Sequence, residues 1–103
     1  MQFSKSMNGL SPTAMRFIDI AIRQKADETN AARWYSWAET PDRQMPPYVA
    51  QIALHALSAF ALTLEKTLED DEIDPQKAAA LENDLGYIAA VEASLTEFLL
   101  SPA

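Results

Sequence analysis

The amino-acid sequence predicts an all-α protein, an antiparallel up-down bundle of three long helices, or of four if the chain breaks between Asp27 and Asn30. Apolar residues recur at three- and four-residue spacing in three segments, which is the pattern of amphipathic helices. Only two of the 103 residues are glycine, so the material for tight hairpin turns is scarce. A chain of this length is predicted to form one domain over residues 1–103, with a flexible N-terminal segment at residues 1–10.

The first helix is predicted to begin at Ser11 and Pro12, because a serine oxygen caps free amides and proline fits the first helical position. Its apolar face comprises Ala14, Phe17, Ile18, Ala21 and Ile22. The stretch that follows is almost wholly polar, and Asp27 and Asn30 are both good N-cap residues. A break there would separate a further helix at residues 31–39, and the sequence leaves both arrangements open.

Residues 48–68 are predicted to form the central helix, which begins after a proline-rich connection at residues 40–47. Its apolar arc is unusually broad. One stripe is Ala50, Leu54, Leu57, Ala61, Leu64 and Leu68, a second is Val49, Ala53, Ala56 and Phe60, and a third flank is Ile52, Ala59 and Leu62. One neighbouring helix cannot cover such an arc. Whether the third flank stays exposed therefore separates a monomer from a dimer or an adaptor.

An acidic connector at residues 69–74 precedes the last helix, which Asp74 and Pro75 are predicted to start. The apolar stripe of this helix is Ala78, Leu81, Leu85, Ile88, Val91, Leu95 and Phe98. We expect the helix to end at Ser101 and Pro102, because proline cannot continue it.

The net charge of −7 lies in the second half of the chain, where residues 48–103 hold ten acidic groups and two lysines. Such a field repels nucleic acid and anionic lipid and attracts basic surfaces. We therefore predict neither a nucleic-acid nor a membrane partner. The charge would favour a protein partner with a basic surface, and it serves equally well for solubility alone. The absence of cysteine and of a basic-then-apolar N-terminal signal favours a cytoplasmic protein.

The sequence predicts no catalytic, cofactor or metal site, and hence no enzyme. His55 is the only histidine, and no carboxylate lies three or four residues from it to form a helical ligand pair. The acidic connector is similar to the opening of a calcium loop, but Pro75 stands where that loop needs glycine and Leu81 where it needs glutamate. Neither glycine has a second one near it, which excludes a glycine-rich phosphate loop.

The candidate partner-binding residues cluster around the proline-rich connection. They are Arg33, Trp34, Tyr35, Trp37, Arg43 and Tyr48. Tryptophan, tyrosine and arginine are the residue types that dominate interface hot spots. The alternative is that Trp34 and Trp37 close the end of the bundle core with Tyr35 at its rim, and the sequence leaves both roles open.

Two stretches resemble known helical families. Asn30, Arg33, Trp34, Pro46, Pro47, Leu57, Ser58 and Phe60 resemble the pattern of FlaF flagellin-synthesis regulators. Leu85, Gly86, Ile88 and Ala89, after the acidic connector, are similar to a stretch in small helical immunity proteins of interbacterial toxin systems. The two resemblances imply different functions, and the sequence does not assign the chain to either family.

For function, we expect a small acidic noncatalytic protein-binding module, an inhibitor or adaptor of the immunity or anti-defence type. The first alternative is a chaperone or regulatory adaptor for an export or flagellar component, which would hold a helix in an apolar groove. The second is a structural homodimer whose extra apolar surface is its own interface.

Overall fold

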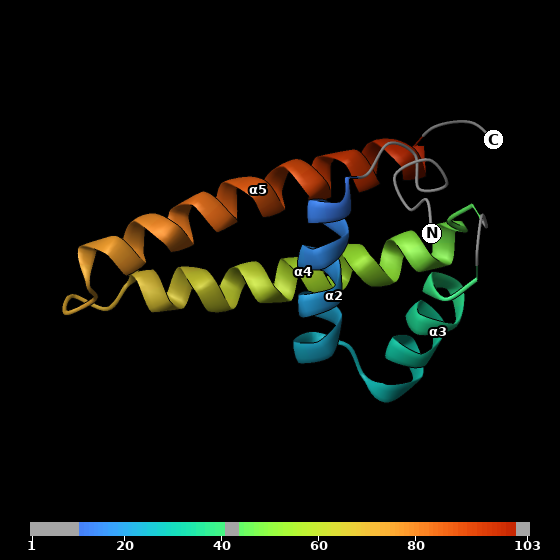
Figure 1. Cartoon of the computed structure of the whole chain (residues 1–103), viewed down its shortest axis with the longest axis horizontal. Helices are drawn as coiled ribbons and strands as arrows, with labels where there is room; N and C mark the ends of the chain where they lie inside the picture. The colour runs from blue at the N-terminus through green and yellow to red at the C-terminus, as the bar shows by residue number, and fades with distance from the viewer. Residues whose placement is uncertain (1–10, 41–43, 101–103) are drawn as a thin grey trace.

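The computed structural model describes residues 11–40 and 44–100, which form four helices packed against one another (Figure 1). These are α2 (Pro12–Lys25), α3 (Glu28–Ala38), α4 (Pro47–Leu68) and α5 (Pro75–Leu100). Within this part of the chain there is no β-strand. The predicted all-α helical fold is therefore confirmed. The expected flexible segment at residues 1–10 and the expected stop at Ser101 and Pro102 lie outside the described residues.

Side-chain caps and prolines set where the helices begin. Ser11 is the N-cap of α2, and its hydroxyl accepts a hydrogen bond from the Ala14 amide at 3.1 Å. Asp27 caps α3 in the same way, because its carboxylate accepts from the Asn30 amide at 2.8 Å. Each bond satisfies an amide that has no partner within its own helix. The chain is extended at Ala26 and Asp27, so it leaves the helical conformation at the point where the sequence left a break open.

The core is built around α4, which packs against all three other helices. The buried side chains of α4 are Val49, Ala50, Ala53, Ala56, Leu57 and Leu64. Half of them are alanines, and alanine lets a neighbouring backbone approach closely. The buried face of α2, with Ile18 and Ile22 at 0% exposure, belongs to the same cluster, as do Trp34 and Trp37 of α3.

The number of helices that pack side by side differs between the two ends of the molecule. Figure 1 shows α4 and α5 lying side by side and joined at one end by the acidic connector, while α2 crosses this pair. The fully buried residues of α5 are Ile88, Val91 and Leu95, all in its second half, whereas Leu81 and Leu85 are only half-buried. Near the connector, the molecule is therefore only two helices thick.

Helix α4 is also long and apolar enough to cross a bilayer, with a mean hydropathy of 1.4 over its most apolar window. By length and composition alone, the core helix of a soluble protein meets the same criterion. The packing of α4 against three helices is what a core helix requires.

Candidate binding cleft between α3 and α4

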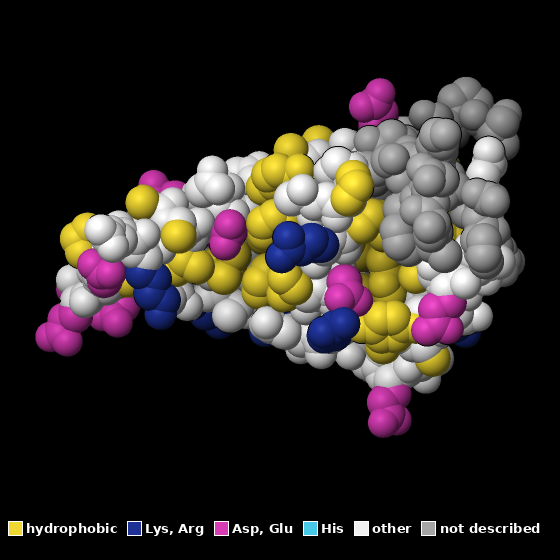
Figure 2. Space-filling model, viewed as in Figure 1, with side chains coloured by type: hydrophobic (Ala, Val, Ile, Leu, Met, Phe, Trp, Pro, Cys, Tyr) yellow, Lys and Arg dark blue, Asp and Glu magenta, His cyan; other side chains and the backbone are white. Residues whose placement is uncertain are grey.

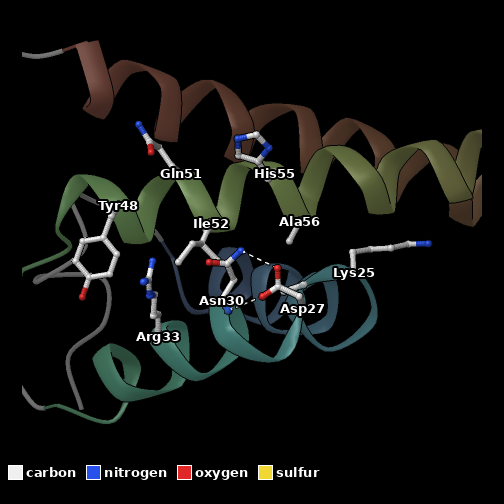
Figure 3. A pocket seen from close by; sticks show the side chains of 10 residues that line it. Lys25, Asp27, Asn30, Arg33, Tyr48, Gln51, Ile52, His55 and Ala56 are labelled. Carbon is white, nitrogen blue, oxygen red and sulfur yellow. Dashed lines mark hydrogen bonds between the residues drawn. The ribbon is translucent and has the colours of Figure 1, made fainter.

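A cleft of about 300 Å³ lies between α4 on one side and the α2–α3 turn with α3 on the other (Figure 3). Its lining residues come from three helices and the turn. They are Lys25, Ala26, Asp27, Asn30, Arg33, Tyr48, Gln51, Ile52, His55 and Ala56.

Helical spacing places these side chains on facing walls. Asn30 and Arg33 are three residues apart on α3, and Tyr48, Ile52 and Ala56 are four residues apart on α4. Residues at these spacings share one face of a helix. Ile52 and Ala56 give the α4 wall an apolar part, and the guanidinium of Arg33 points from α3 toward α4 (Figure 3).

The charged groups of the cleft are Lys25 and Arg33, which only donate hydrogen bonds, and Asp27, which accepts them. Among the described residues that line it, Asp27 is the one carboxylate, and that group already accepts two hydrogen bonds from Asn30, from the backbone amide at 2.8 Å and from Nδ2 at 3.3 Å. Within residues 11–40 and 44–100, the side chains of Lys25, Arg33 and Gln51 form no hydrogen bond or ion pair. The cleft therefore offers free donors to a ligand.

Two of the predicted partner-binding residues meet at this cleft. Arg33 on α3 is exposed, and Tyr48 at the start of α4 is 45% exposed, with its ring at the rim (Figure 3). They are 15 positions apart in the sequence, and the α3–α4 connection brings them together. Arg43 lies outside the described residues.

Trp34 and Trp37 lie in the core, at 1% and 2% exposure. They are three residues apart on the buried face of α3, with ring centroids 5.3 Å apart and planes tilted by 53°. The Trp37 indole nitrogen also donates a hydrogen bond to the Gln44 carbonyl at 2.9 Å. Of the two roles that the sequence left open, these rings occupy the core position, because their three-residue spacing puts both on the buried face of α3, with Tyr35 half-buried beside them.

Tyr35 connects α3 to α2. It is half-buried, and its side chain forms a hydrogen bond with Arg23, whose pKa is raised above its ordinary value first by this bond and then by Asp19. Arg23 also forms an ion pair with Asp19 at 3.1 Å. Tyr35 does not line the cleft. Its position instead holds α3 against the helix before it.

The cleft includes residues that the sequence analysis did not select, chiefly Lys25, Asn30, Gln51 and His55. The sequence does contain one pattern that indicates the α4 wall of this cleft. Tyr48, Gln51 and His55 follow one another at three- and four-residue spacing, so they interrupt an apolar helix with a single polar face.

The cleft can bind a ligand through charged and neutral donors. Among the residues that the structure describes, no group of three or more His, Cys, Asp or Glu side chains is placed to hold a metal ion.

Comparison of the chain with family models, with curated proteins and with solved structures finds no match.

Proposed function

We propose that this protein is a noncatalytic protein-binding module of the cytoplasm, an inhibitor or adaptor that holds its partner at the cleft between α3 and α4. The observation that carries the proposal is that Arg33 of α3 and Tyr48 of α4 line the same open cleft and are both exposed. Arginine and tyrosine are favoured at hot spots because each combines a large contact area with hydrogen-bonding capacity. The buried Trp34 and Trp37 give the α3 wall a fixed base, which reduces the ordering cost of binding.

The acidic half of the chain adds a second contact. Figure 2 shows acidic side chains at the end of the molecule where α4 and α5 are joined. This supports a partner that carries a basic patch, because opposite charges accelerate encounter. On the fold, we propose that α4 and α5, joined by residues 69–74, form the antiparallel part of the expected up-down bundle.

Affinity purification with the full-length protein tests the proposal. The wild-type protein should capture a specific partner, and Arg33→Ala and Tyr48→Ala should each reduce capture about tenfold, since a hot-spot residue contributes about 1.4 kcal/mol or more. Arg16→Ala is the matched control, because Arg16 is exposed on α2 and does not line the cleft. Recovery of the protein alone, or equal capture by all variants, would contradict the proposal.

A second candidate is the chaperone or regulatory adaptor that holds a helix in an apolar groove. It is supported by exposed apolar side chains beside the crossing of α2 and α5, where Ile20 is 39% exposed and Tyr87 is 37% exposed. Tyr87 stacks on half-buried Phe17, with ring centroids 5.1 Å apart. Figure 2 shows apolar side chains gathered on this face of the molecule.

Salt separates the two candidates. Binding through Arg33 and the acidic surface should weaken as salt rises, whereas binding in an apolar groove should persist. If the protein is the adaptor with an apolar groove, Ile20→Ser should reduce capture while Arg33→Ala does not.

The homodimer is a third candidate, since Leu62 of the third apolar flank is 59% exposed, while Ile52 and Ala59 are half-buried. Light scattering that shows a monomer at all concentrations would exclude it.

A further inference from the structure

We propose that the cleft between α3 and α4 receives the carboxylate of a glutamate side chain from the protein partner. The inference rests on the proposed function and specifies the chemistry of the group that enters the cleft. It also adds to the charge argument above, because a partner that is basic elsewhere would present one acidic side chain here.

The first step of the argument is the state of the cations. Arg33 and Lys25 both line the cleft, and neither has a hydrogen-bond or ion-pair partner among the described residues. The guanidinium group of arginine can form two parallel hydrogen bonds with one carboxylate, which is the strongest common pairing of this kind. The exposed Arg33 side chain extends from α3 toward α4 (Figure 3).

The second step is that the cleft's own carboxylate does not occupy this position. Both oxygens of Asp27 accept from Asn30, at 2.8 Å and 3.3 Å, as part of the cap of α3. Among the described lining residues, Arg33 is the cation that points across the cleft, whereas the side chain of Lys25 extends away from the other labelled residues (Figure 3). The chain as a whole, with a net charge of −7, repels free anions, and Arg33 offers an anion a local cationic contact at the cleft.

The third step selects the source of the carboxylate. A free phosphate has no apolar part that Ile52 and Ala56 could contact, whereas a glutamate side chain has methylene groups and is also held by the rest of the interface. The cleft of about 300 Å³ is larger than a carboxylate alone, and Ile52 and Ala56 can cover the methylene groups of glutamate. The ring of Tyr48 at the rim can pack on the partner's backbone.

Titrations followed by two-dimensional ¹H–¹⁵N NMR test the proposal on the full chain. The probes are the capped peptides acetyl-Ala-Glu-Ala-amide and acetyl-Ala-Gln-Ala-amide. We expect the glutamate peptide to shift the amide signals of Asn30, Arg33, Gln51 and His55 with one shared saturation curve. The glutamine peptide, which has the same shape without the charge, should leave them unchanged. Signals of α5 near Leu81 serve as an internal reference.

Three variants are expected to affect the Kd of the glutamate peptide differently. Arg33→Gln should raise the Kd of the glutamate peptide about tenfold, because a charged pair of hydrogen bonds is lost. Asp27→Asn should lower the Kd about threefold, because it removes the carboxylate found among the described lining residues and asparagine still caps a helix. Arg16→Gln removes the same charge as Arg33→Gln from outside the cleft and should leave the Kd within about a factor of 1.5.

Several results would overturn the proposal. Equal shifts with both peptides would mean that binding does not depend on the charge of the glutamate carboxylate. An unchanged Kd in Arg33→Gln would mean that Arg33 does not bind this carboxylate. Inorganic phosphate that shifts the same amides at lower concentration than the glutamate peptide would mean that the site takes a free anion. If the glutamate peptide does not bind but Arg33→Ala still loses the captured partner, this inference fails and the proposed function stands.

Discussion

Trp37 shows how a single side chain connects α3 to the segment that leads into α4. Its indole nitrogen donates to the Gln44 carbonyl at 2.9 Å, and the ring is 2% exposed. Trp37→Phe removes the donor and replaces the indole with a smaller ring, so we expect the free energy of unfolding to fall by about 2–3 kcal/mol, from the lost hydrogen bond and the cavity left behind. Urea denaturation followed by circular dichroism measures this change. Tyr48→Phe is the control. The Tyr48 ring is 45% exposed, so removal of its hydroxyl group should change the free energy of unfolding little.

Removing Trp34 tests the placement of the indole pair. A tryptophan that acts only at an interface can be truncated without loss of stability, but Trp34 is 1% exposed and packs on Trp37. We expect Trp34→Ala to lower the free energy of unfolding by about 3–5 kcal/mol, through lost burial and the cavity left behind. Arg33→Ala, one position away and exposed, should stay within about 0.5 kcal/mol of the wild type. A stable Trp34→Ala variant that has lost only partner binding would contradict the core placement.

Residue type predicted part of the candidate site. Arg33 and Tyr48 meet at the cleft, but Trp34 carries the same hot-spot signal and lies in the core. Composition cannot separate the two cases, because the features that make tryptophan a strong interface residue also make it a strong core residue. The difference depends on which face of α3 meets α4, and this follows from the turn at Ala26 and Asp27.

At the scale of elements, the start of α3 depends on one side chain. Asp27→Ala removes the acceptor for the Asn30 amide, so we expect a loss of about 0.5–2 kcal/mol in stability. Asp27→Asn should retain most of it, since asparagine caps as well as aspartate does. Thermal denaturation of both variants measures the difference. Equal loss in both would mean that the charge of Asp27, and not its cap, stabilises α3.

The start of α2 could be predicted from the sequence, whereas α3 begins at Glu28 and not at residue 31, and the crossing of α2 over α4 and α5 could not be predicted. Ser11 with Pro12 carries a local chemical signal, and α2 begins at the predicted position. Apolar periodicity shows that α2 has a buried face, without showing the angle at which that face meets its neighbour. The two extended residues, Ala26 and Asp27, turn the chain so that α3 as well as α2 can pack on α4.

Over the whole molecule, burial decreases from the crossing of α2 toward the acidic connector. Fully buried side chains of α5 begin at Ile88, and before it Leu81 and Leu85 are only half-buried. Segments with few buried apolar contacts open at lower free energy than the core. We therefore expect the amides of residues 77–82 to show hydrogen-exchange protection at least about tenfold lower than those of residues 88–95. Exchange measured by NMR at low protein concentration compares the two halves of one helix.

Hydrogen exchange also tests whether a second copy of the protein packs on the end of α4 and α5 near the acidic connector. A second copy packed on exposed Leu62 and on the half-buried residues of α5 would raise protection there as protein concentration rises, while residues 88–95 would not change. A monomer should show the same low protection at every concentration. Acidic charge near the connector opposes pairing of two copies through this end, since like charges would be brought together. We therefore expect protection that is independent of concentration and that rises only when a partner of opposite charge binds.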